Sequence, residues 1–123
     1  ASAGLVDIPS DAPAEFGGPG NRWSPESLLV ASVADCFVLS FRAVARASKF
    51  EWKSLAVDVT GKLDRPAGAA ASFTEFTTHA KLVVAPGADA ARAKTLLEKA
   101  EKICLITASL KGVNDLHAEV VEG

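Results

Sequence analysis

The pattern of apolar and polar positions predicts one long helix in the first half of the chain. Between Pro25 and Ser48, apolar side chains fall on nearly every side of the expected helix. They are Leu28, Leu29, Val30, Val33, Phe37, Val38, Leu39, Phe41 and Val44. A helix that is apolar all round is buried on all sides. Because one domain of 123 residues can hardly cover such a helix completely, the pattern favours a partner subunit as part of the cover.

A capping sequence marks the start of this helix. Ser24 can cap the free N–H groups of the first turn, and Pro25 stands where a missing N–H costs nothing. Glu26 suits the positive end of the helix dipole. The preceding residues 10–23 hold two prolines and three glycines, which is typical of a loop.

Strict alternation predicts a hairpin after the helix, with strands in residues 54–64 and 73–85 joined by a turn. On the expected inner face lie Leu55, Val57, Val59 and Leu63 in the first strand and Phe76, Thr78, Ala80, Leu82 and Val84 in the second. Residues 4–9 indicate a short strand or strand remnant, and residues 116–121 a last strand.

A second helix is predicted from Ala90 to Cys104, with Asp89 as its N-cap and one apolar stripe. The stripe consists of Ala93, Leu96, Leu97, Ala100, Ile103 and Cys104. The order of elements is that of an α+β fold with a long buried helix and antiparallel strands. We expect a single domain over residues 1–123, with an incomplete strand region at the N-terminus.

The composition of the chain argues against a nucleic-acid-binding protein and against a membrane protein. Hydrophobic residues make up 49% of the chain and charged residues 23%, with a net charge of −2 and no basic stripe, so no nucleic-acid partner is expected. The longest weakly charged run, Ser27–Phe41, contains Asp35 and is shorter than the roughly 20 residues that span a bilayer. No signal peptide is recognisable, so we expect a cytoplasmic protein without membrane contact. The chain starts at Ala1 and contains no Met, so we expect either processing or further residues before it.

The two cysteines, Cys36 and Cys104, allow two interpretations. They are inert core residues, which composition alone favours, or they are a redox pair. The sequence contains no CxxC motif and no cluster of Cys and His at the spacing of a metal site, so no metal is expected. A reactive Cys36 has to be a thiolate, and burial raises the pKa of a thiol. Asp35 would not help to form the thiolate, so a reactive Cys36 needs a cation nearby.

Glu26 precedes Cys36 by ten residues, which on a straight helix is about 15 Å along the axis. The two cannot meet within one chain. Glu26 is either a first-turn acid or a residue that serves the Cys36 of another subunit, across an antiparallel helix pair. His79 and His117 lie on predicted strands with no acid or cysteine patterned around them, so we interpret both as surface or edge residues.

The segment 16–37, FGGPGNRWSPESLLVASVADCF, resembles the OsmC/Ohr family in its glycine loop, its Ser-Pro-Glu helix start and its Cys-Phe ending. A second family hallmark is a cysteine at the end of the second helix, usually written Cys-Pro-x-Ser. Here residues 104–107 are CLIT, so Cys104 and Thr107 are similar to the pattern and Leu105 replaces the proline. The resemblance extends from about Gly4 to the end of the chain.

The resemblance implies an OsmC-like fold in an intertwined homodimer with active sites at the interface. It also implies a thiol-dependent peroxidase acting on organic or lipid hydroperoxides. Cys36 would be the peroxidatic thiol and form a sulfenic acid, and Cys104 would resolve it as a disulfide. A dithiol or a lipoylated protein would then reduce the disulfide, without metal, haem, flavin or other cofactor. Glu26 would orient the activating cation across the dimer.

Two departures from the family pattern leave alternatives open. The family uses an arginine to stabilise the thiolate, and here the candidates are Arg22, Arg42 or a residue preceding Ala1. Leu105 in place of proline could alter the turn that presents Cys104. The alternative function is a non-catalytic OsmC-like dimer that binds an apolar ligand at the helix interface and keeps its cysteines for packing.

Overall fold

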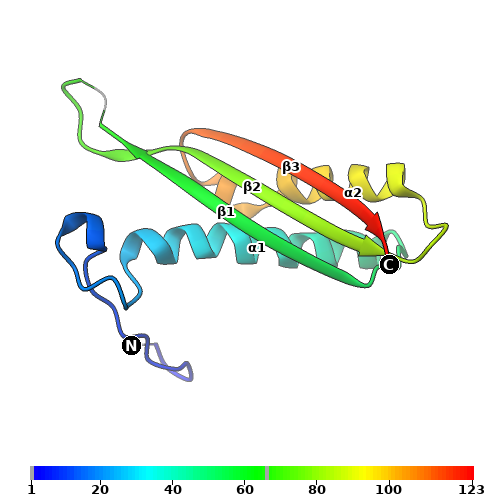
Figure 1. Ribbon diagram of the computed structural model, residues 1–123, viewed down its shortest axis with the longest axis horizontal. Helices are drawn as coiled ribbons and strands as arrows, with labels where there is room; N and C mark the ends of the chain where they lie inside the picture. The colour runs from blue at the N-terminus through cyan, green and yellow to red at the C-terminus, as the bar shows by residue number, and fades with distance from the viewer. Residues whose placement is uncertain (1, 66) are drawn as a thin grey trace.

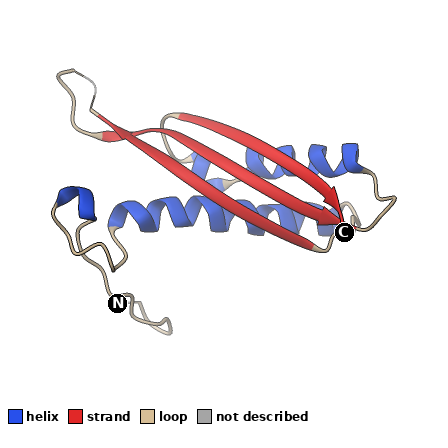
Figure 2. Ribbon diagram, viewed as in Figure 1, coloured by secondary structure: helices blue, strands red, loops and turns tan. Residues whose placement is uncertain are grey.

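The computed structural model describes residues 2–65 and 67–123. It contains two long helices, one short helix and three strands (Figure 1). Their bounds are Pro25–Ala47 (α1), Ser54–Asp64 (β1), Ser72–Val84 (β2), Ala90–Ile103 (α2), Leu105–Ala108 (α3) and Val113–Glu122 (β3), with a 3-10 turn at Ala14–Phe16 (η1). The strands form one sheet, and α1 and α2 pack together on one face of it (Figure 2). The predicted α+β class is confirmed.

The sheet has the order β1-β2-β3 and is mixed. β1 and β2 form the predicted antiparallel hairpin, with a register shift between Lys62 and Leu63. β3, however, runs parallel to β2, so the expected antiparallel pairing holds for β1 and β2 but not for β3. The reason is the connection: α2 carries the chain back along the sheet, so the next strand starts at the same end as β2.

The expected strand in residues 4–9 was also wrong. These residues are exposed and irregular, and among residues 2–24 the only sheet-like pairing is a single bridge between Ser10 and Trp23. A strand forms only where its N–H and C=O groups find a neighbouring strand, and no described strand runs beside this segment. Leu5, at 70% exposure, and Val6, at 91%, therefore lie open to solvent.

The helix start was predicted correctly. Ser24 and Ser27 form a reciprocal capping box, in which the hydroxyl of Ser24 accepts from the N–H of Ser27 at 3.0 Å and the hydroxyl of Ser27 accepts from the N–H of Ser24 at 2.8 Å. Pro25 is the first helical residue, as expected. α1 ends at Ala47, one residue before the predicted end.

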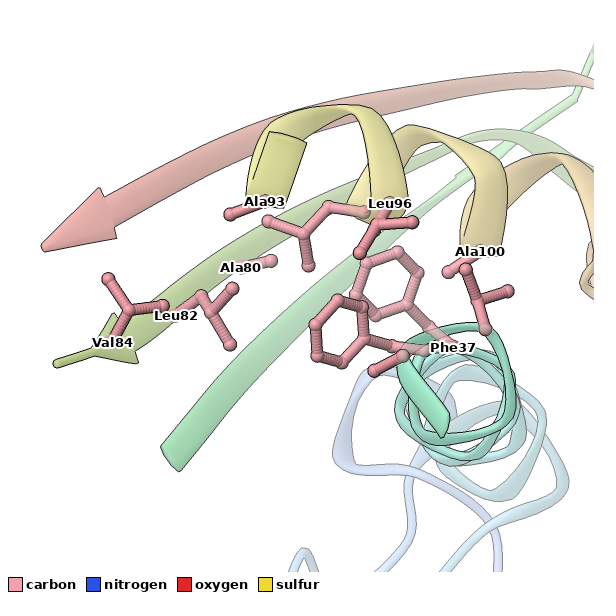
Figure 3. Packing of buried hydrophobic residues seen from close by; sticks show 11 residues of the cluster. Phe37, Ala80, Leu82, Val84, Ala93, Leu96 and Ala100 are labelled. Carbon is pink, nitrogen blue, oxygen red and sulfur yellow. The ribbon is translucent and has the colours of Figure 1, made fainter. Parts of the chain in front are cut away.

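One core lies between the sheet and the two helices (Figure 3). The figure shows Phe37 of α1, the β2 residues Ala80, Leu82 and Val84, and the α2 residues Ala93, Leu96 and Ala100 converging on the same space. The inner face predicted for β2 is confirmed, because all five of its residues are buried. β1 contributes half-buried side chains at the rim.

α1 is not buried on all sides within a single chain. Its buried residues, Val33, Phe37, Phe41, Val44 and Ala45, form one stripe, while Leu39 on another side is 50% exposed. By length and composition alone, α1 would also qualify as a membrane span, although its weakly charged run Ser27–Phe41 is shorter than a bilayer requires. The buried stripe shows that this helix is a core element of the domain.

We expect Phe41→Ala to lower the free energy of unfolding by about 3–5 kcal/mol, because the ring is fully buried and packs edge-on against Trp52 at 5.4 Å. Urea unfolding followed by circular dichroism measures the change. Phe16→Ala is the matched control, because that ring is 60% exposed and its removal should cost less than about 1 kcal/mol. Equal losses in the two variants would contradict this assignment of the core.

Candidate active site

The two cysteines, far apart in sequence, meet where α1, α2 and α3 pack together. Cys36 lies at the middle of α1 and is half-buried, and Cys104 is 1% exposed in the break between α2 and α3. Both are free thiols, and the Cys104 side chain is close enough to Cys36 to lower the pKa of its thiol. The structure therefore brings the predicted pair into one site.

The break that holds Cys104 is fixed by local hydrogen bonds. Cys104 has an extended backbone, with φ −62° and ψ 113°, so it ends α2 and acts as the N-cap of α3. Its N–H donates to the carbonyl of Glu101 at 3.3 Å, and its own carbonyl accepts from the N–H of Ala108 at 3.0 Å and from the hydroxyl of Thr107 at 3.2 Å. The thiol is thereby held against α1.

Cys36 lies near Ser40 of its own helix and near the residues that follow α2. Its sulfur lies 3.9 Å from the hydroxyl of Ser40, one turn further along α1. The Cys104 side chain and the backbone of Ile106 and Leu105 lie close enough to affect the pKa of the thiol. Leu105 and Ile106 are the first residues of α3, which follows Cys104 directly.

The pKa of the Cys36 thiol results from two opposing effects. Burial raises it, and the hydrogen bonds from Cys104, Ile106, Ser40 and Leu105 lower it, so that the net pKa lies below the ordinary value of 9.0. No Lys or Arg of the described residues is among the groups that lower it. The cation expected near a reactive Cys36 therefore stays a prediction.

Neither candidate arginine lies at the thiol. Arg22 is exposed in the loop before α1 and lines a surface hollow with Pro9 and Trp23. Arg42 is exposed on α1. Asp35 is exposed as well. This agrees with the step of about 100° between neighbouring residues of a helix, by which the Asp35 side chain need not face the Cys36 site.

Glu26 lies in the first turn of α1, ten helical residues from Cys36, and the structure does not bring the two together within one chain. Its carboxylate borders a cavity of about 500 Å³ that is walled mostly by apolar side chains, among them Phe16 and Phe73. The Oε2 atom of Glu26 is buried and has no hydrogen-bond partner among the described residues. A buried carboxylate oxygen without a donor favours the approach of a cation or a hydrogen-bond donor from elsewhere.

Sequence reasoning missed this cavity. Gly61 stands in its wall, and a Cβ at that position would come within 2.9 Å of both the Phe73 ring and Val30. The glycine lets these two side chains approach the backbone of β1. A glycine in the middle of an alternating strand is the signal that could have indicated such a close approach.

His79 and His117 lie on the exposed face of the sheet, as predicted. They are neighbours on β2 and β3, their rings stack with centroids 4.8 Å apart, and His117 pairs with Asp115 at 2.9 Å. Within the described residues, no three His, Cys, Asp or Glu side chains are arranged to hold a metal ion.

Comparison with known proteins places this arrangement in a family. The family described as OsmC-like protein matches residues 18–118, which include both cysteines and Glu26. The chain belongs to this family. The OsmC-like chain is 27% identical over 113 residues to the organic hydroperoxide resistance protein of Xanthomonas axonopodis pv. citri, covering 90% of this chain and 76% of that one. It is 26% identical over 116 residues to the uncharacterised protein YmaD of Bacillus subtilis, covering 87% and 73%.

Solved structures agree with the OsmC-like fold. An OsmC-like protein of unknown function from Vibrio cholerae superposes with a TM-score of 0.82 at 18% identity, covering 97% of this chain and 80% of that one. An organic hydroperoxide resistance protein OsmC from Legionella pneumophila gives a TM-score of 0.77 at 26% identity, covering 95% and 82%.

The environment of Glu101 predicts a pH-dependent stability. Burial raises its pKa above the ordinary 4.5, Asp115 and Glu98 add to the rise, and Lys102 opposes it. The folded chain therefore binds this proton more tightly than the unfolded chain, and stability falls as pH rises from the unfolded pKa through the folded pKa. We expect Glu101→Gln to raise the free energy of unfolding at pH 7, with the gain vanishing below about pH 4.

Urea unfolding at several pH values measures this gain. Glu51→Gln, at an exposed glutamate after α1, is the control for loss of a negative charge. A gain from Glu101→Gln that is equal at pH 7 and at low pH would contradict the role of the carboxylate charge.

Proposed function

We propose that this protein is a thiol-dependent peroxidase that reduces organic hydroperoxides to alcohols. The observation that carries the proposal is the pair of free thiols, in which Cys36 is accessible and has a lowered pKa and Cys104 lies buried beside it. A thiolate next to a second thiol is the arrangement that two-step thiol oxidation requires. The relatives named for organic hydroperoxide resistance support the same reaction.

In the first step the Cys36 thiolate attacks the distal oxygen of the hydroperoxide. The O–O bond breaks, the leaving alkoxide takes a proton and departs as the alcohol, and Cys36 becomes a sulfenic acid. In the second step the sulfur of Cys104 attacks the sulfenic sulfur, the hydroxyl leaves with a proton as water, and an S–S bond forms. The closeness of the two side chains, indicated by the effect of Cys104 on the Cys36 pKa, favours this second step.

A reductant from outside the chain has to return the two electrons. A dithiol or a lipoylated protein would do so by thiol–disulfide exchange, first forming a mixed disulfide and then closing its own. Because the two cysteines supply both electrons to the peroxide, the proposed cycle uses no metal and no other cofactor.

The surroundings of the thiols favour an organic peroxide. Leu39, one turn after Cys36 on α1, is 50% exposed, and Leu105, beside Cys104, is 77% exposed. Ile103 is 47% exposed at the end of α2. Apolar side chains around a reactive sulfur favour a substrate with an apolar tail over hydrogen peroxide.

We further propose that the protein acts as a cytoplasmic homodimer through the uncovered side of α1. An antiparallel pair of α1 helices would place the Glu26 end of one helix near the middle of the other. Glu26 would then orient an activating cation at the partner subunit's thiol, and its unpartnered Oε2 supports such a role. The apolar cavity beside Glu26 supports the alternative function, a dimer that binds an apolar ligand without catalysis.

Thiol counting tests the peroxidase proposal. We expect excess cumene hydroperoxide to remove both free thiols of the reduced protein, and none in Cys36→Ser. Cys104→Ser should lose one thiol and accumulate a sulfenic acid that dimedone traps, because the resolving group is gone. If both thiols of the unmodified protein persist, the peroxidase proposal is wrong, and tight binding of an apolar probe would then favour the alternative.

A mixed dimer tests the cross-chain role of Glu26. One chain carries Glu26→Ala and the other Cys36→Ser. If Glu26 serves the partner's thiol, both changes fall in one site, and the other site keeps about half of the dimer's oxidation rate. If Glu26 serves its own chain, both sites are impaired, and the loss of nearly all activity would contradict the cross-chain arrangement.

A further inference from the structure

Cys36 lies in a row of small side chains along α1. Ser32 stands one turn before it and Ser40 one turn after it, and all three residues are half-buried. Residues four positions apart lie on the same face of a helix, so both serines are neighbours of Cys36 on this face. They therefore provide the same chemical group at matched positions on either side of the thiol.

The two serine hydroxyls have different partners. The Ser32 hydroxyl donates to the carbonyl of Leu29 at 2.6 Å, whereas the Ser40 oxygen lies 3.9 Å from the Cys36 sulfur. In the described part of the chain, Cys36 is the only hydrogen-bond partner of the Ser40 hydroxyl. The reason is the tilt of side chains toward the N-terminus of a helix, which leans Ser40 over Cys36 and leans Ser32 away from it.

The hydroxyl of Ser40 is suited to a lasting role at the sulfur. Burial raises the pKa of the Cys36 thiol, and Ser40 is among the groups that lower it. Cys104 is the other titratable side chain at this sulfur, and it is itself a reactant in the proposed cycle. Asp35 and Arg42, the nearest charged residues along α1, are exposed. A serine hydroxyl does not ionise at neutral pH, so it stays available as a donor throughout the cycle.

We propose that Ser40 is a positioning residue for the attacking sulfur, and that its hydroxyl donates a hydrogen bond to the Cys36 thiolate. The inference rests on the proposed function, which needs that thiolate, and it names a side chain that stabilises it. A hydroxyl can also accept from a neutral thiol, so the contact serves both protonation states of Cys36. We expect the separation to shorten in the thiolate, because hydrogen bonds to a charged acceptor are shorter than those between neutral groups.

Three variants separate the hydroxyl from the rest of the helix. Ser40→Ala removes the hydroxyl beside the sulfur, and Ser32→Ala is the matched control, because it makes the same change one turn on the other side of Cys36. Alanine favours helices, so both variants should keep α1 intact. Ser40→Thr is the conservative variant, because it keeps the hydroxyl.

The test is the pH profile of Cys36 alkylation by iodoacetamide, with the modified cysteine identified by mass spectrometry. We expect Ser40→Ala to move the midpoint of this profile to higher pH. Below the midpoint, alkylation should slow roughly twofold to fivefold, and the rates should converge at high pH, where the thiol is fully ionised. Ser32→Ala and Ser40→Thr should keep the profile of the unmodified protein.

Three results would overturn the proposal. The first is a Ser40→Ala profile equal to that of Ser32→Ala. The second is a slowing that persists at high pH, because a donor to the thiolate acts only through the ionisation of the thiol. The third is a Ser40→Thr profile that follows Ser40→Ala, since the hydroxyl would then not be the responsible group. The measurement uses no peroxide, so a failure here is distinct from a failure of the thiol-oxidation experiment.

Discussion

The packing of α1 against β2 and α2 is the interaction on which the rest of the structure depends. Phe37 and Phe41 occupy the space between the sheet and the second helix, and this contact fixes the rotation of α1. Cys36 directly precedes Phe37, so its direction follows from the core. A rotation of α1 by one residue, about 100°, would turn the sulfur away from the break between α2 and α3. The geometry of the thiol pair is therefore a consequence of hydrophobic packing.

The pKa of the Cys36 thiol reflects a balance between burial and hydrogen bonding. Burial alone disfavours the thiolate, and an aromatic residue follows Cys36 on the helix. Hydrogen bonding to Cys104, Ile106, Ser40 and Leu105 outweighs this effect on the pKa, and three of these four residues follow α2 directly. Such donors act over a single hydrogen bond, so they lower the pKa of this sulfur without making the surrounding surface cationic.

Local signals predicted much of the fold. The Ser24 cap, the helix bounds and the buried face of β2 could be read from the sequence because each depends on residues near one another. The direction of β3 and the irregular backbone of residues 4–9 depend on which strands lie side by side in the sheet. The local pattern of apolar and polar residues does not determine that pairing. At the site, the two cysteines left an inert and a redox interpretation open, because their meeting depends on how α1 packs against α2 and α3. The cavity beside Glu26 forms where β1 approaches α1 closely. In the sequence, Gly61 is the residue that indicates this close approach.

The unequal burial of the two sulfurs gives a direction to any exchange reaction at this site. Cys104 is almost completely covered, whereas Cys36 can be reached from solvent. If the two were joined in a disulfide, an incoming thiolate could approach only the Cys36 sulfur in line with the bond, so Cys104 would be the leaving group. The intermediate would then carry the foreign thiol on α1, and the break after α2 would hold the released thiolate beside it. The fold thus makes one cysteine the point of entry and the other the internal partner.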